Sequence, residues 1–179
     1  MKATGIVRRI DDLGRIVIPK EIRRTLRIKD GDPLEIYTDT DGEVIFKKYS
    51  PVGELSDFVS TYAEVISKVG NFPVLISDRD HIVAAAGISK REFLERRITQ
   101  SAEEFIENRK SYHFSEKQYP LQPVEGMESQ ALLIYPIISA GDVIGSVIML
   151  STEEKRVPTE TDVKLIQTAA AFLGRQTEE

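Results

Sequence analysis

The first fifty residues consist of short β-prone runs separated by turns, and this pattern most restricts what the chain can fold into. Residues 4–10 and 15–18 flank a turn sequence at 11–14, which predicts a β-hairpin. A second hairpin is predicted over residues 34–48, where apolar and polar residues alternate on both sides of a turn rich in Asp and Gly. Four short strands of this kind cannot enclose a core on their own.

Between the two hairpins the sequence predicts a short helix. Pro19 presets the backbone for a first helical turn, and Ile22 and Leu26 form one apolar stripe while the neighbouring arginines point elsewhere. A domain of about fifty residues with one two-turn helix needs an additional source of stability, such as a disulfide, a metal or a second chain.

Composition removes two of these three sources. The chain of 179 residues has no cysteine, and its only histidines are His81 and His113. A disulfide, a thiol nucleophile and a Cys-ligated zinc are therefore excluded, and a multi-histidine metal site or a histidine-based catalytic triad is disfavoured. We therefore predict no metal and no cofactor, and expect hairpins exchanged between two chains to close the core.

The formal net charge of -5 conceals an uneven distribution. Residues 1–29 hold nine Lys and Arg against three acidic residues, a net charge of +6, whereas residues 51–179 sum to -7. A basic leading segment on an acidic body is typical of a protein that binds a polyanion, usually nucleic acid. On charge alone, a solvated basic surface remains the alternative.

The second half of the chain contains two amphipathic helices. Ser50 and Pro51 predict the start of the first, and a capping box at 159–162 predicts the start of the second. Each carries apolar residues at alternating spacings of three and four, a stripe that could face its own domain, a partner helix or both. From these stripes we predict an oligomerisation surface formed by Leu55, Phe58, Tyr62, Val65, Ile166, Ala170 and Leu173.

Strands are predicted between these helices, the clearest being a hairpin over residues 132–150. Strands flanked by terminal helices indicate an α+β domain with helices packed on an antiparallel sheet. The whole chain is therefore expected to be a mixed α and β protein. Its predicted domains are residues 1–50, which their charge predicts to bind nucleic acid, and residues 51–179, which we expect to be a regulatory, sensor-type domain that oligomerises.

The run DDLGRIVIPKEIRRTL at residues 11–26 closely resembles the DNA-binding domain of the AbrB-type transition-state regulators, and the match extends over about residues 3–50. That resemblance implies an interleaved, swapped-hairpin dimer that presents basic residues to double-stranded DNA. Guanidinium groups bind phosphates and guanine edges with two hydrogen bonds, which suits this role independently. The DNA contacts implied by the resemblance are Arg8, Arg9, Arg15, Lys20, Arg23 and Arg24.

The whole chain also resembles the stage V sporulation protein T family, which implies a sporulation transcription regulator with a GAF-like second domain and a tetramer built from two swapped dimers. Residues 141–145 and the alternating run that follows resemble the GAF hairpin. GAF domains often bind a small-molecule effector, and the corresponding residues here would be Ala86, Ser89, Tyr112 and His113. The competing interpretation is that these four side chains only pack or face solvent.

An enzyme and an antitoxin are the two alternative functions. An enzyme is disfavoured because the paired acids Glu103-Glu104 and Glu153-Glu154 are sequence neighbours that point apart on a helix. The antitoxin half of a toxin pair shares the head domain but typically ends in a disordered tail, unlike the patterned residues 51–179. With no apolar stretch near 20 residues, we expect a cytoplasmic, nucleoid-associated protein without a membrane segment.

Overall fold

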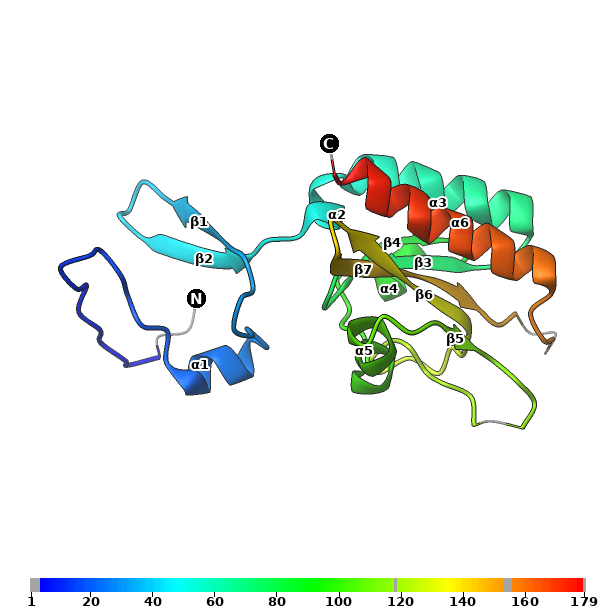
Figure 1. The fold of residues 1–179 in the computed structure, drawn as a ribbon, viewed down its shortest axis with the longest axis horizontal. Helices are drawn as coiled ribbons and strands as arrows, with labels where there is room; N and C mark the ends of the chain where they lie inside the picture. The colour runs from blue at the N-terminus through cyan, green and yellow to red at the C-terminus, as the bar shows by residue number, and fades with distance from the viewer. Residues whose placement is uncertain (1–3, 118, 153–155, 179) are drawn as a thin grey trace. The chain divides into compact units, whose positions relative to one another are not determined.

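The computed structural model describes residues 4–117, 119–152 and 156–178, and Glu153 and Glu154 of the second acidic pair lie outside these ranges. The chain divides into two compact units, Met1–Tyr49 and Ser50–Glu179 (Figure 1). Each unit has its own secondary structure and is described separately below.

The first unit contains one short helix and one hairpin. Helix α1 spans Lys20–Thr25, and strands β1 (Leu34–Thr38) and β2 (Val44–Lys48) pair antiparallel with Ile36 opposite Phe46. In the turn between the strands, the Asp39 carboxylate accepts hydrogen bonds from the backbone N–H groups of residues 41 and 43. The predicted second hairpin is thus confirmed.

The predicted first hairpin is only partly present. Its turn forms, since the Asp11 N–H donates to the Arg15 carbonyl oxygen at 3.0 Å, but the flanking residues 4–10 and 15–18 are not strands. The prediction of two paired strands within one chain is therefore wrong. The physical reason is that these residues are not packed against a core: Val7 and Val17 are 85% and 71% exposed, and an isolated two-stranded ribbon is marginal in water.

The second unit is built on a five-stranded antiparallel sheet with the strand order β4-β3-β7-β6-β5. The long hairpin predicted over residues 132–150 is confirmed as the antiparallel pair β6 and β7, in which Ile137 lies opposite Gly145. The strands are β3 (Val74–Ser77), β4 (Ile82–Ala86), β5 (Tyr112–His113), β6 (Ala131–Ser139) and β7 (Asp142–Leu150).

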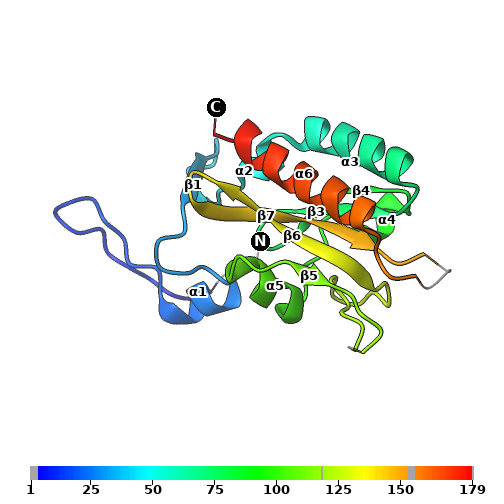
Figure 2. The same cartoon turned by 45° about the vertical axis from the view of Figure 1, so that its right-hand side comes forward.

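Helices cover both faces of this sheet, as Figure 2 shows for the pair α3 and α6 on one side and α5 on the other. Each face has its own apolar core, because alternate residues of a strand point to opposite sides. The helices are α2 (Pro51–Glu54), α3 (Ser56–Gly70), α4 (Lys90–Phe93), α5 (Gln100–Glu107) and α6 (Glu160–Gln176).

The first amphipathic helix differs from the expectation of one continuous element. It starts at Ser50, whose hydroxyl accepts a hydrogen bond from the Gly53 N–H at 3.0 Å, but it is interrupted at Leu55 and restarts as α3. Glycine is a poor helix residue, which weakens the segment immediately before the interruption. Both parts of the interrupted helix pack on the core, since Val52 in α2 and Val59 in α3 are fully buried.

Helix α6 approaches the sheet very closely at Gly174. A Cβ atom at this position would overlap the carbonyl oxygen of Ile138 on strand β6. Only glycine lets the two backbones come this close, so Gly174 determines how deeply the C-terminal half of α6 sits on the sheet.

The start of α6 is held by the predicted capping box. The Thr159 hydroxyl accepts from the Asp162 N–H at 3.2 Å, and the Asp162 carboxylate accepts from the Thr159 N–H at 2.8 Å. Arg156 adds two hydrogen bonds to the same carboxylate, at 2.5 and 3.2 Å. Burial alone would raise the pKa of Asp162, but the hydrogen bonds from Arg156 and Thr159 outweigh it and hold that pKa below its ordinary value.

Replacing Asp162 with alanine should therefore loosen the whole of α6. We expect its opening free energy to fall by about 2 kcal/mol, or about thirtyfold in amide exchange rate, because a cap and a charged hydrogen bond are both lost. Hydrogen–deuterium exchange over residues 160–176 measures this. Because the folded pKa is lowered, the stabilisation is complete above the ordinary value of 3.8 and is lost as the pH falls through the folded pKa.

The matched control is Glu160→Ala, which removes a carboxylate from the same helical turn. Among the described residues Glu160 pairs only with the exposed Lys164, at 2.7 Å, so this substitution should change amide exchange very little. Equal effects of the two substitutions would show that helix dipole charge, and not the cap, stabilises α6.

Candidate nucleic-acid interface

The turn at residues 11–15 is organised by a single carboxylate. Asp11 Oδ1 accepts hydrogen bonds from the backbone N–H groups of Leu13, at 3.0 Å, and Arg15, at 2.8 Å. Gly14 supplies the left-handed conformation that closes the turn, with φ of +75°. The sequence folds locally here because the N–H groups of residues 11, 13, 14 and 15 all find acceptors within the turn itself.

The same carboxylate holds a side chain. Asp11 Oδ2 accepts from Arg15 Nε at 2.8 Å, while the Arg15 side chain stays 70% exposed. The backbone N–H and then the guanidinium of Arg15 are the main groups that lower the pKa of Asp11 below its ordinary value. Asp11 is therefore ionised throughout the pH range in which proteins bind nucleic acid.

Helix α1 supplies the next basic residues. It begins after the buried Pro19, whose carbonyl oxygen accepts from the Arg23 N–H at 3.0 Å, and ends where Arg27 takes a left-handed conformation with φ of +53°. Positions 20, 23 and 24 are neighbours on one side of a helix. The short helix therefore gathers three of the predicted basic residues.

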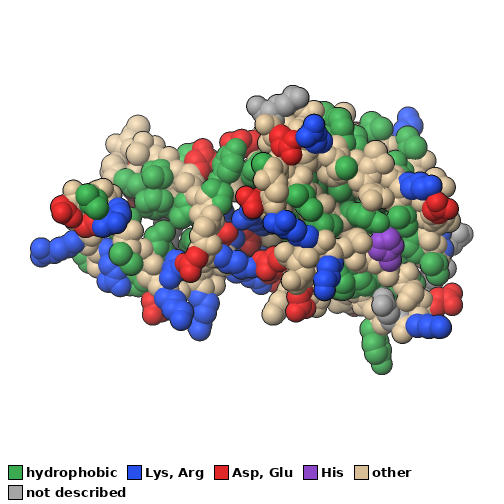
Figure 3. Space-filling view, viewed as in Figure 1, with side chains coloured by type: hydrophobic (Ala, Val, Ile, Leu, Met, Phe, Trp, Pro, Cys, Tyr) green, Lys and Arg blue, Asp and Glu red, His purple; other side chains and the backbone are tan. Residues whose placement is uncertain are grey.

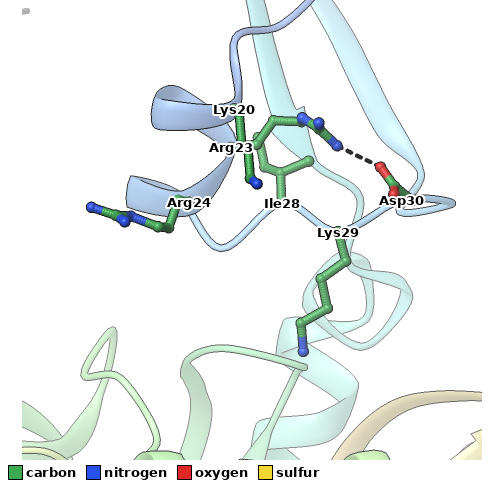
Figure 4. Close-up of a pocket in the computed structure, with 6 residues that line it drawn as sticks. All are labelled: Lys20, Arg23, Arg24, Ile28, Lys29 and Asp30. Atoms are coloured by element: carbon green, nitrogen blue, oxygen red, sulfur yellow. Dashed lines mark hydrogen bonds and ion pairs between the residues drawn. The ribbon is translucent and has the colours of Figure 1, made fainter.

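An open pocket of about 370 Å³ lies beside this helix. Figure 4 shows the Arg23 guanidinium reaching across to form an ion pair with Asp30, while Arg24 extends away from the other side chains. Four of the six lining residues are cationic: the pocket is formed by Lys20, Arg23, Arg24, Ile28, Lys29 and Asp30. Such a pocket favours an anion.

All six residues predicted to contact DNA lie in the first unit. Arg23 is half-buried and the other five, Arg8, Arg9, Arg15, Lys20 and Arg24, are exposed. The structure brings Lys20, Arg23 and Arg24 together at the pocket, and Figure 3 shows Lys and Arg side chains gathered around this part of the unit. Lys29 was missed as a site residue, although it was part of the basic segment whose charge pointed here.

The predicted oligomerisation residues separate into two groups. Phe58 and Val65 on α3 are 40% and 53% exposed, and Leu55 and Tyr62 are half-buried, so this stripe reaches the surface of the unit. By contrast, Ile166, Ala170 and Leu173 are at most 3% exposed and belong to the core on the sheet face that α3 and α6 cover. Their assignment to a surface between chains is therefore corrected.

Another residue of α6 completes the exposed stripe. Phe172 is 42% exposed, and its ring centroid lies 5.1 Å from that of Tyr62 and 6.1 Å from that of Phe58. We call Phe58, Tyr62 and Phe172 the aromatic trio. The helical period could have revealed Phe172, since it lies on the side of α6 that turns away from the core stripe.

The four residues predicted to line a ligand pocket do not lie together. Ala86 is on edge strand β4 and Tyr112 is on the opposite edge strand β5, and they belong to the cores of different sheet faces. Ser89 and His113 are exposed, and His113 Nε2 is 2.9 Å from the Tyr135 hydroxyl. The expectation of one pocket at these residues is therefore wrong, because the sheet order separates them by three strands.

Within residues 4–117, 119–152 and 156–178, no three His, Asp or Glu side chains are placed to hold a metal ion together. Nor does this part of the chain contain a helix with the length and apolarity that a bilayer requires.

Comparison with known proteins decides the family. A family model described as stage V sporulation protein T C-terminal, transcription factor, matches residues 54–178. Stage V sporulation protein T of Bacillus subtilis (strain 168) is 48% identical over 181 residues, covering all of both chains. The chain belongs to the stage V sporulation protein T family.

Within this family member, the first unit has relatives of its own. The transition state regulatory protein AbrB of B. subtilis is 57% identical over 63 residues, covering 32% of this chain and 65% of AbrB. A solution structure of the AbrB N-terminal DNA recognition domain is 63% identical, covers 28% of this chain and 94% of that one, and has a TM-score of 0.25. A MazE bacterial antitoxin model also matches residues 7–54.

Two solved structures of other proteins resemble the second unit in fold alone. A methionine-R-sulfoxide reductase from Thermoplasma acidophilum is 13% identical with a TM-score of 0.53, and covers 69% of this chain and 92% of that one. The cyanobacteriochrome receptor PixJ is 14% identical with a TM-score of 0.54, and covers 73% and 99%. This sporulation-family chain therefore combines an AbrB-type first unit with the GAF-like α+β fold that the sequence predicted.

Proposed function

We propose that the protein is a DNA-binding regulator of sporulation-stage transcription, with residues 1–50 as its DNA-binding domain and residues 51–179 as its oligomerisation domain. The observation that carries this proposal is the set of exposed cations on the turn at 11–15 and around α1. Exposed guanidinium groups bind phosphate and guanine edges, and the family and AbrB relatives are regulators by name. A regulator of this kind needs no catalytic site.

The first unit must acquire its DNA-binding form by pairing with a second chain. Val7, Ile10, Leu13 and Val17 are each at least 70% exposed, an apolar surface that one chain leaves uncovered. Residues 4–10 and 15–18 are β-prone, and the described part of their own chain offers them no strand partner. Interleaving with the same residues of a second copy satisfies both needs and doubles the basic surface.

The second unit is proposed to join two such dimers into a tetramer. Its aromatic trio and the exposed Val65 and Val69 form a continuous apolar stripe along α3 and α6. A second copy of the same stripe would cover it in a helix bundle. The tetramer would then hold two DNA-binding heads on one assembly in the cytoplasm, at the nucleoid.

The antitoxin alternative is not favoured. An antitoxin would use its C-terminal segment as a disordered toxin-binding tail, but residues 50–179 form a compact unit with a five-stranded sheet. The antitoxin model matches only the first unit, whereas the sporulation transcription-factor model covers the second.

Binding to double-stranded DNA at several salt concentrations tests the proposal. A dimer using four arginines per chain displaces on the order of seven counterions, so log Kd should rise steeply with log salt, by roughly 0.9 per phosphate contact. Fluorescence anisotropy with a labelled duplex measures the slope. No binding, or a slope near zero, would contradict the DNA-binding function.

A further inference from the structure

We propose that Asp11 is a positioning residue for DNA recognition, which holds Arg15 ready to contact DNA although Asp11 itself carries the charge that phosphate repels. This inference rests on the proposed DNA-binding function. It concerns an acidic residue inside the basic segment that neither the charge pattern nor the resemblance to AbrB-type regulators marks as part of the site.

The geometry of the Asp11 carboxylate supports this role. One oxygen, Oδ1, accepts from the Leu13 and Arg15 N–H groups and fixes the turn, while the other, Oδ2, accepts from Arg15 Nε. A single side chain thus fixes both the backbone on which Arg15 stands and the direction in which its guanidinium points.

The contact leaves Arg15 able to bind. An arginine has five N–H donors, and among the described residues the interaction with Asp11 uses only the one on Nε. The two terminal nitrogens remain available for a fork-shaped contact with a phosphate or a guanine edge. With 70% of its side chain exposed, Arg15 is held and not hidden.

Holding a long side chain before binding has a measurable benefit. A free arginine loses rotamer freedom when it contacts DNA, and that loss weakens binding. If Asp11 restricts Arg15 in advance, part of the loss has already occurred in the free protein. The opposite possibility is that Asp11 only neutralises Arg15, in which case removing the carboxylate charge would strengthen DNA binding.

Asp11→Asn separates these two effects in the full-length protein. Asparagine keeps an oxygen for the turn N–H groups but removes the charge that pairs with Arg15. We expect DNA affinity to fall about threefold to tenfold, since two copies of an exposed ion pair act in each dimer. Simple charge removal predicts the opposite, a rise in affinity.

Asp12→Asn is the matched control, because it removes the same charge from the adjacent residue. Among the described residues Asp12 makes no side-chain hydrogen bond or ion pair, so its replacement should leave affinity unchanged or raise it. Anisotropy with one duplex at one salt concentration compares the two variants, and circular dichroism checks that both remain folded.

A double-variant cycle identifies Arg15 as the residue through which Asp11 acts. In an Arg15→Ala background Asp11→Asn should no longer weaken binding, whereas in an Arg24→Ala background it should still do so. A loss that persists without Arg15 would assign Asp11 a structural role and overturn the proposal. If Asp11→Asn binds as tightly as Asp12→Asn, the proposal is also wrong, while DNA binding by the wild type still stands; if the wild type does not bind, the proposed function itself fails.

Discussion

Replacing both Arg23 and Arg24 with alanine will lower DNA affinity by at least about a hundredfold, because the proposed swapped dimer would lose four cations. The two residues lie next to each other on α1 and both line the basic pocket. The salt slope should decrease at the same time, since fewer counterions are displaced. Anisotropy titrations at several salt concentrations measure both quantities.

The single variants should differ from each other. Arg24 is exposed and makes no contact with the other side chains drawn in Figure 4, so Arg24→Ala should weaken binding without changing the fold. Arg23 is half-buried and paired with Asp30, so Arg23→Ala should also loosen the segment that follows α1. Thermal unfolding followed by circular dichroism distinguishes the two.

The control for the double variant removes two cations elsewhere. Arg91 and Lys110 are exposed residues of the second unit. Replacing them with alanine changes the net charge equally and should weaken binding much less. Equal losses from both double variants would mean that net charge, and not the surface around α1, determines DNA affinity.

Phe58→Glu combined with Phe172→Glu should dissociate the proposed tetramer into dimers. Both side chains are about 40% exposed, at 40% and 42%, so a single unit can accept charges there without unfolding. In a bundle between two units, the four new carboxylates would be buried without partners, and we expect association to weaken by at least about a hundredfold. Sedimentation velocity of the full-length protein measures the change.

Leu94→Glu combined with Val157→Glu is the matched control, since these residues are 38% and 46% exposed but lie outside the aromatic trio. This pair should leave the tetramer intact. DNA affinity of the dissociated variant should fall, because two linked heads bind one duplex more tightly than one head. A tetramer that survives Phe58→Glu and Phe172→Glu would show that the stripe is not the interface.

Features determined by neighbouring residues could be predicted from the sequence. Turn and cap residues within a few positions of each other determine three such features: the second hairpin, the hairpin of β6 and β7, and the capping box at Thr159. The basic surface of α1 was predictable for the same reason. Helical spacing alone brings Lys20, Arg23 and Arg24 to one side.

Features that depend on distant pairing could not be predicted. The residues flanking the first turn are β-prone, but their composition does not say whether a partner strand is available to them within the same chain. The resemblance to GAF domains placed Ala86 and Tyr112 in one pocket. The residues near them do not reveal that β3 pairs with β7, in a sheet that places the two at opposite edges. Sheet order is a property of the whole domain.

The two helical stripes illustrate an intermediate case. The helical spacing of their apolar residues was predicted correctly, but that spacing does not specify whether the stripe packs on the domain's own sheet or stays exposed. On α3 the residues buried in the core are Val59 and Ile66, and Phe58 and Val65 are exposed. On α6 the buried residues include Ile166 and Leu173. The prediction of a surface stripe therefore agrees with the exposure of Phe58 and Val65 on α3, but it is wrong for the buried Ile166 and Leu173 on α6.

The close approach of α6 to strand β6 at Gly174 fixes the register of that helix along the sheet. Shifting α6 by one residue would bring the side chain of Leu173 or Arg175 against the Ile138 carbonyl oxygen, where not even a Cβ atom fits. Helix α6 therefore cannot slide along the sheet, and the position of Phe172 along the helix axis stays fixed relative to Tyr62. Any signal that changes the proposed tetramer must move whole units against each other or tilt α3, because translation of α6 is blocked.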